Sequence, residues 1–398
     1  MKLIGTIGGS ASILDIAIAP IGEFSIASFP PGMSWCWFSG YGTVGERDGS
    51  LTFLVRRSGD TSKAATVDYA LDQKSSVREG TNVIGTFGKI YFAPGVSDRN
   101  FSVFLIDDSI REGDQNLTIK LKDPTGGFFV SDEGDWSLGI TDNDAIASQT
   151  NPVDQTRFFV REHYIDFLNR EPDNAGLQFW QSQLNACGFD QQCLLRQRVN
   201  ISAAFFLSIE FQQTGYLVYR FYKASFGRLP QFNEFMPDKQ VIGQDVVVNT
   251  LGWEQQLEKN KAAFANFWLQ RPDFKELYDS KTNAQYVDVL IANTGVAFSQ
   301  LERDALINGL NNATETRATV LRKIAENQTF AQQEFNRAFV LMQYFGYLRR
   351  NPNEGPDTDY SGYEFWLNKL NAFNGDYNKA EMVKAFISSD EYRQRFGP

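Results

Sequence analysis

Residues 85–127 read GTFGKIYFAPGVSDRNFSVFLIDDSIREGDQNLTIKLKDPTGG, and this stretch decides the fold of the first half of the chain. Apolar side chains alternate with polar ones in it, as in Leu117, Ile119 and Leu121. Alternation with a period of two is typical of strands that bury one face. Turn sequences such as APG, EGD and PTGG recur at short intervals, which indicates a small antiparallel sandwich rather than a parallel sheet.

The same alternation continues on both sides of this stretch, from Ser50 to Asp144, and includes SLTFLVRR at 50–57. The first forty residues lack it, because their apolar run is interrupted by glycines. We therefore predict an irregular N-terminal segment at 1–40 and an all-β sandwich at 41–144. The polar stretch at 145–156, which contains Pro152, is predicted to be a linker.

From residue 157 to residue 398 the apolar spacing changes to three and four, which predicts helices. The sequence also repeats: FVREHYIDFLNREPDNAGLQFWQSQLN at 159–185 returns as FVLMQYFGYLRRNPNEGPDTDYSGYEFWLNKLN at 339–371. A fainter copy begins at Leu217, and a helix-closing phrase recurs four times. We therefore predict a multidomain chain, with an antiparallel β-sandwich followed by an all-α domain of about four related helical units.

Each unit is predicted to contain a helix, a loop, a second helix, and a third helix that ends in an aromatic residue. These four closing residues are Phe211, Phe274, Phe330 and Tyr392. In the first unit, Asp173 or Asn174 can cap the second helix, which is expected to bury Phe179 and Trp180.

Composition limits the classes of partner. The chain has 398 residues, of which 42% are hydrophobic and 14% aromatic, enough for more than one packed core. Its formal charge of −10, with no basic stripe, argues against nucleic acid as a partner. We find no run of about 20 apolar residues that would span a membrane. The N-terminus is a poor signal peptide, so an export signal is expected to be degenerate or to lie upstream.

Three cysteines are present, and no Cys or His set has the spacing of a zinc site. Cys36 stands apart, whereas Cys187 and Cys193 form a close pair. In a secreted protein this pair would close a short loop as a disulfide, and the alternative is two free thiols.

Acidic residues gather in the loops of the β half. Singly, each is typical of a solvated turn. Together they supply the carboxylate and carbonyl oxygens that calcium requires, about six to eight per ion, if the loops meet at one end of the sandwich. Carboxylates crowded there without a cation would repel one another.

At these residues the chain resembles a known family. The stretch at 85–127, closed by ITDND at 140–144, is similar to the Calx-beta repeat of sodium/calcium exchangers, an integrin subunit and many bacterial extracellular proteins. The resemblance spans about residues 44–144 and implies a seven-stranded, immunoglobulin-like sandwich that binds Ca²⁺ at one end. The ligands that it implies are Glu46, Asp107, Asp108, Glu112, Asp142 and Asp144.

Two positions depart from the pattern of that family. Asn82 stands where the family often has an acid, and Gln115 stands where the EGDE turn usually ends in Glu. These departures imply a weaker site or fewer ions.

The helical half, at about 157–397, resembles an uncharacterised bacterial family, domain-of-unknown-function family 4214, through HYIDFLNREPDNAGLQFW and SAAFFLSIEF. That family often ends large surface or secreted proteins. The resemblance implies an extracellular or cell-surface setting and transfers no catalytic residue.

Our leading hypothesis is a non-enzymatic, calcium-binding protein with a structural, adhesive or attachment role, whose partners include cell-surface polysaccharide or other surface proteins. The first alternative is a carbohydrate-binding module, which needs an exposed platform formed by Tyr216, Tyr219, Trp253 and Trp268. The second alternative is an extracellular hydrolase. The one histidine, His163, is expected at the core edge or the surface, because no nucleophile or orienting carboxylate is identified beside it.

Overall fold

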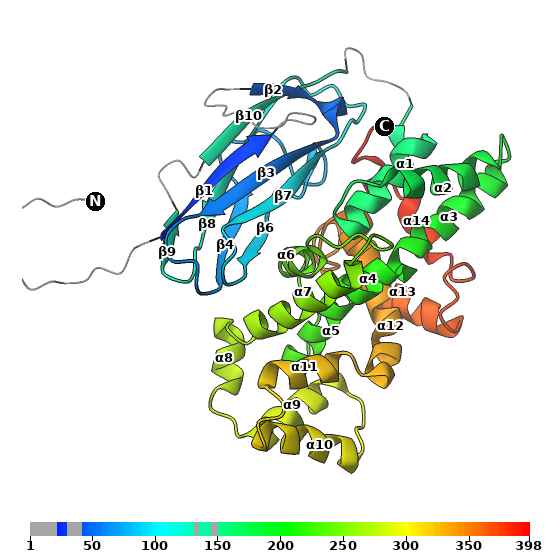
Figure 1. Cartoon of the computed structure of the whole chain (residues 1–398). Coiled ribbons are helices and arrows are strands. Elements are labelled where there is room, and N and C mark those ends of the chain that lie inside the picture. The colour runs from blue at the N-terminus through cyan, green and yellow to red at the C-terminus, as the bar shows by residue number, and fades with distance from the viewer. Residues whose placement is uncertain (1–21, 30–41, 131–134, 145–149) are drawn as a thin grey trace, which may run out of the picture.

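The alternating segments form two five-stranded sheets that pack face to face, and helices cover one side of this sandwich (Figure 1). The computed structural model describes residues 22–29, 42–130, 135–144 and 150–398. One sheet has the order β5-β7-β3-β1-β9, formed by Val83–Ile84, Asp98–Leu105, Ser50–Arg57, Gly22–Phe29 and Phe128–Val130. The other has the order β2-β10-β8-β4-β6, formed by Gly42–Gly45, Asp135–Thr141, Gln115–Lys122, Ala65–Leu71 and Gly88–Phe92.

The predicted class, a sandwich followed by a helical region, is confirmed, with two corrections to its details. The residues described form ten strands rather than seven, and the pairs β1–β9 and β2–β10 are parallel. In addition, the segment predicted to be irregular at 1–40 contains β1, which lies between β3 and β9 in the first sheet. The first two strands therefore lie in different sheets, β1 in the first sheet and β2 in the second.

Strand β3 shows why the alternation predicts the sandwich. Leu51, Phe53 and Val55 point inward and are buried. Arg57 takes the next inward position, where it is 1% exposed and donates hydrogen bonds to four backbone carbonyls. A buried guanidinium is tolerated because its donors are satisfied in this way.

Strand β7 departs from the alternation. Val103 and Leu105 face the sandwich core as predicted. Phe104, on the outer face of β7, and Ile106, the residue after the strand ends, are equally buried. They pack in the same apolar cluster as the helices. At the C-terminal end of β7 both faces are therefore interior, because the helical region covers the outer face there, whereas Asn100 nearer its start is exposed.

The helical region begins with the short 3-10 helix η2, Pro152–Asp154. Four sets of helices follow. The first contains α1 (Thr156–His163) with its π-helical end η3 (Tyr164–Leu168), α2 (Asn174–Asn185), α3 (Gln191–Leu207) and α4 (Ile209–Gln213). The second contains α5 (Gly215–Phe226), α6 (Phe232–Gly243), α7 (Trp253–Trp268) and α8 (Pro272–Tyr278). The third contains α9 (Asn283–Thr294), α10 (Gln300–Asn311) and α11 (Arg317–Ala325). The last contains α12 (Gln328–Gln343) with η4 (Tyr344–Leu348), α13 (Ser361–Ala372), α14 (Met382–Ile387) and α15 (Asp390–Arg393).

The same local geometry recurs in all four sets. The first helix of each set ends at a residue with left-handed φ; these residues are Asn169, Gly227, Gly295 and Arg349. The sequence copies at 159–185 and 339–371 also share a rarer feature, since each first helix ends in a π-turn. The four-unit prediction therefore has a counterpart in the backbone.

The predicted position of the closing aromatic residue needs correction. Each one lies in the first turn of a new helix, three residues after its N-cap, and not at the end of the third helix. In the first set, Ser208 Oγ accepts a hydrogen bond from the Phe211 N–H; in the last, Ser389 Oγ accepts one from Tyr392. All four rings are buried. The recurring phrase is therefore a helix start anchored by an aromatic ring, and in three of the four sets a side chain caps it.

Two other expectations are wrong in part. Helix α2 turns Leu177 and Leu184 toward the core, so that Phe179 remains 54% exposed and Trp180 is half-buried. The linker predicted at 145–156 lies partly outside the described residues. In its described part, Asn151, Pro152 and Val153 are buried against the helices.

Helix α6 docks the helical region onto strand β6. Gln240 of α6 accepts a hydrogen bond from the Tyr69 hydroxyl at 3.0 Å. Gly88 of β6 lies directly beneath this pair, and a Cβ at that position would collide with Gln240 and the Tyr69 ring. The two regions therefore share a close-packed interface that requires glycine at Gly88.

Candidate calcium site

Strand pairing brings two acidic segments together at one end of the sandwich. Strands β2 and β10 run parallel, with Gly45 opposite Thr141. The next residue in each strand direction is acidic, so Glu46 and Asp142 emerge side by side. Oxygen atoms of Glu46, Asp142 and Asp144 all lie within 4.8 Å of one another. This triad is the centre of the candidate site.

Asp107 and Asp108 approach the triad from the end of β7. The Leu105 N–H donates to the Gly49 carbonyl at 2.8 Å, which ties this loop to the turn that carries Glu46. Asn143 lies between the loops, because its Nδ2 donates to Asp107 Oδ1 at 2.8 Å and to Glu46 Oε2 at 3.4 Å. Five of the six predicted ligands therefore gather around one point.

Glu112 is placed differently. Its Oε2 accepts hydrogen bonds from Asn82 Nδ2 at 2.5 Å and from Gln115 Nε2 at 3.3 Å. These are the two amides that stand where the Calx-beta pattern has acids. They hold the Glu112 carboxylate through donors, whereas acids at the same positions would repel it and compete for cations.

Burial and neighbouring charges shift the pKa values of several carboxylates in the cluster. Burial, followed by the charges of Asp108, Asp142 and Asp144, raises the pKa of Glu46 to about 8. Burial and neighbouring carboxylates likewise raise the pKa of Asp108 to about 7. Burial opposes ionisation of Asp142 too, but backbone N–H groups of Asp144, Gly113 and Glu112 outweigh it and lower the pKa of Asp142. Asp142 therefore favours its charged form, whereas Glu46 and Asp108 would be charged more readily with a cation nearby.

The atoms left without partners are of the kind that calcium binds. Among the described residues, Asp144 Oδ2, Asn143 Oδ1 and Gln115 Oε1 are buried at this end of the sandwich and accept no hydrogen bond. Each is an oxygen and can be satisfied only by a donor or a cation. A cluster of carboxylate and amide oxygens fits Ca²⁺, which prefers hard oxygen ligands. Glu46, Asp142 and Asp144 would hold the ion, with Asp107, Asp108 and Asn143 in reach.

The chain is a β-sandwich with an acidic cluster at one end, joined to a set of helical repeats. Residues 39–136 match the family described as the Calx-beta domain, and residues 141–215 match the Domain of unknown function (DUF4214). The chain therefore contains a Calx-beta domain followed by a DUF4214 domain, in the order that the sequence predicts. The second match covers the first helical set.

Three similar proteins each match less than a third of this chain. The sodium/calcium exchanger Calx of Drosophila melanogaster is 36% identical over 92 residues, which are 23% of this chain and 10% of the exchanger. Sodium/calcium exchanger 3 of Homo sapiens is 37% identical over 71 residues, 18% of this chain and 8% of that protein. The crystal structure of the apo-form Calx CBD1 domain is 29% identical, covers 31% of this chain and 99% of that domain, and has a TM-score of 0.26. The chain thus spans about a tenth of the exchangers' length.

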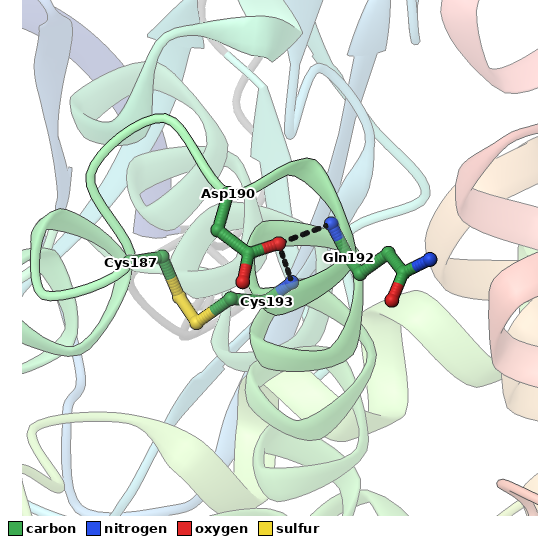
Figure 2. The surroundings of a disulfide bond; sticks show 4 residues. All are labelled: Cys187, Asp190, Gln192 and Cys193. Carbon is green, nitrogen blue, oxygen red and sulfur yellow. Dashed lines mark hydrogen bonds between the residues drawn. A yellow bond between two sulfur atoms is a disulfide. The ribbon is translucent and has the colours of Figure 1, made fainter.

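A disulfide joins α2 to α3. Cys187 and Cys193 are bonded, with their Cα atoms 5.5 Å apart, and Asp190 caps α3 by accepting from the N–H groups of Gln192 and Cys193 (Figure 2). Figure 2 shows the bond closing the turn in which Asp190 lies. Cys36 lies outside the described residues.

His163 lies deeper than the core edge or surface at which it was expected. It is fully buried, with Nδ1 2.7 Å from the Phe159 carbonyl and Nε2 2.8 Å from Ser202 Oγ. Burial lowers its pKa to about 4. Ser202, a partner that the sequence did not reveal, is itself 1% exposed. A substrate therefore cannot reach this serine–histidine pair, and the pair ties α1 to α3.

The aromatic platform predicted for carbohydrate is wrong as placed. Tyr216, Tyr219 and Trp268 are buried, and Trp253 is half-buried. These rings pack between helices, since apolar residues at helical spacing face the core. No helix among the described residues has the length and apolar character to cross a membrane.

Proposed function

We propose that this chain is a non-enzymatic calcium-binding module of an extracellular or cell-surface protein, in which the ion orders the sandwich loops. The observation that carries the proposal is the convergence of Glu46, Asp142 and Asp144 with buried oxygens that lack partners. Calcium would bind these loops only when they are folded, so it would stabilise the folded state. The gain is about 2.7 kcal/mol at a calcium concentration one hundred times Kd.

The test compares thermal unfolding with calcium and with chelator, alongside isothermal titration with CaCl₂. We expect the double substitution E46Q and D144N to abolish the calcium-dependent rise in Tm. The same variant should unfold at the wild-type temperature or higher in chelator, because it removes the carboxylate repulsion. Asp123→Asn, in a turn of the sandwich outside the acidic cluster, is the control and should keep the full shift. A wild-type Tm indifferent to calcium would refute the proposal.

The extracellular setting is supported by the Cys187–Cys193 bond, because disulfides persist in oxidising compartments. The structural or attachment role is supported by the helical repeats, because repeat domains commonly serve as binding surfaces. Brief protease treatment of intact producing cells, followed by blotting for the chain, tests the location. Loss of the band places the protein on the surface, and complete protection places it inside.

A second function, carbohydrate binding, is favoured by exposed rings at equivalent positions of the first and last helical sets. Phe179 and Phe365 are 54% and 57% exposed, and each packs edge-on against the following tryptophan. A groove of about 650 Å³ adjoins Phe179, with Arg170, Asp173 and Asn249 among its lining. Exposed rings beside polar groups suit stacking on sugar rings.

Affinity electrophoresis in polysaccharide gels tests this function. The double substitution F179A and F365A should remove any retardation of the protein. Phe189→Ala removes an even more exposed ring that lacks a tryptophan neighbour and serves as the matched control. Equal retardation of all three proteins would exclude the aromatic pairs as the binding site.

A further inference from the structure

One arginine of the helical region holds both loops that carry candidate ligands. Arg161 of α1 donates from Nη2 to the Gly49 carbonyl at 2.7 Å and from Nη1 to the Leu105 carbonyl at 3.1 Å. Gly49 follows the turn that bears Glu46, and Leu105 precedes Asp107 by two residues. The guanidinium is fixed in turn by Glu171, whose two oxygens accept at 2.6 and 3.0 Å. Arg161 therefore bridges these two loops beside the Leu105 N–H to Gly49 carbonyl bond, and links both of them to α1.

A second connection runs from the last residues of the chain to the same end of the sandwich (Figure 1). The Ser109 N–H and hydroxyl both donate to the Phe396 carbonyl, at 2.9 and 3.2 Å, directly after Asp108. The neighbouring Arg395 donates to the Gly80 carbonyl at 2.8 Å, in the turn that carries Asn82. Three loops around the candidate site are thus held by residues of the helical region.

These connections have an energetic consequence. Without a cation, the crowded carboxylates of Glu46, Asp107 and Asp108 must either repel one another or take up protons, whereas a bound cation draws their loops together. The two carbonyls that Arg161 holds belong to those loops, and Ser109, next to Asp108, donates to the Phe396 carbonyl. A loop spacing that suits both the cation and the docked helices would make binding and docking favour one another by the same free energy.

We propose that calcium binding and docking of the helical region are reciprocally coupled through Arg161. The inference rests on the calcium-binding function proposed above. It goes beyond that function by making the helical region part of the calcium response, although no helical residue is placed among the ligands.

The test is calcium titration of the full chain carrying Arg161→Gln. Loss of a positive charge near the site would by itself tighten calcium binding. Coupling predicts the opposite sign, an affinity about tenfold weaker, within the range typical of linked sites. Arg322→Gln removes an equal charge from α11, where Arg322 pairs with Glu258 and Glu326, and should leave the affinity unchanged. An unchanged or tighter affinity for Arg161→Gln overturns the proposal.

Hydrogen exchange of the wild-type chain supplies a readout that needs no variant. Calcium should slow amide exchange in α1 and in residues 390–397, as well as in the sandwich loops. Calcium that binds by titration but protects only the loops overturns the coupling and leaves the calcium function intact. If calcium gives neither binding heat nor protection from exchange, both the coupling and the proposed calcium-binding function are wrong.

Discussion

At the scale of single residues, the repeats show how one position can keep a contact while changing its chemistry. His163 and Gln343 occupy equivalent places, and each bonds to the carbonyl four residues earlier, of Phe159 and Phe339. Both side chains are buried. Of these two side chains only His163 can take up a proton. At this position, therefore, only the first helical set loses stability in acid.

His163→Gln should therefore reduce the acid sensitivity of folding. The pKa of His163 is lowered to about 4 in the folded chain, against a usual 6.5, so the unfolded chain binds its proton more readily. The contribution of neutral His163 to the free energy of unfolding is fully present above pH 6.5. It falls by about 3 kcal/mol in all as the pH decreases toward 4. Denaturant titrations of both proteins at pH 7 and pH 4 measure the difference. Equal losses in the two would contradict the assignment to His163.

At the scale of helices and strands, local rules explain what the sequence predicts and where it fails. The alternation of β3 and β8 is read correctly, because each has one face in the sandwich core. The predicted ligands lie near one another because they follow ends of adjacent strands. Burial of Phe104 and Ile106 could not be predicted, since it depends on helices that begin about fifty residues later. The π-turns before Asn169 and Arg349 likewise have no signature in apolar spacing.

The recurring capped helix start supplies a prediction of its own. Ser208→Ala and Ser389→Ala should each destabilise the chain by about 1 kcal/mol, because each removes the acceptor for one N–H in the first helical turn. Ser361→Ala, at the first position of α13 rather than at its cap, should change little. Urea unfolding midpoints give the comparison. A loss at Ser361 as large as at the other two would show that the caps are not the cause.

At the scale of the whole molecule, the sandwich and the helices share one interior. Ile84, Phe104 and Ile106 of the sandwich belong to the apolar cluster of the helical region. Tyr69 and Gln240, Glu79 and Arg349, and Ser109 and Phe396 add polar connections across the same boundary. The sequence predicts a linker between two domains and does not predict this interface, because it joins residues as distant as Ser109 and Phe396, which are 287 positions apart.

The shared interior predicts a single unfolding transition for both regions in calorimetry, with equal calorimetric and van't Hoff enthalpies.

Gly88→Val should separate the regions or lower Tm, because the new side chain would enter the space of Gln240 and Tyr69. Gly243→Ala, near the end of the same α6, has open space around it and is the control. Two transitions in the wild-type chain would show that the regions unfold independently.

The doubly buried strand β7 also bears on how the chain is made. A ribosome releases the sandwich first, when Ile84, Phe104 and Ile106 face water. The apolar cluster that they join is completed only by Phe396, which emerges nearly three hundred residues after Phe104. During that interval the growing chain exposes an apolar face suited to unwanted association. Safe synthesis of this molecule therefore depends on how quickly translation and early helix docking conceal a surface that the finished protein never shows.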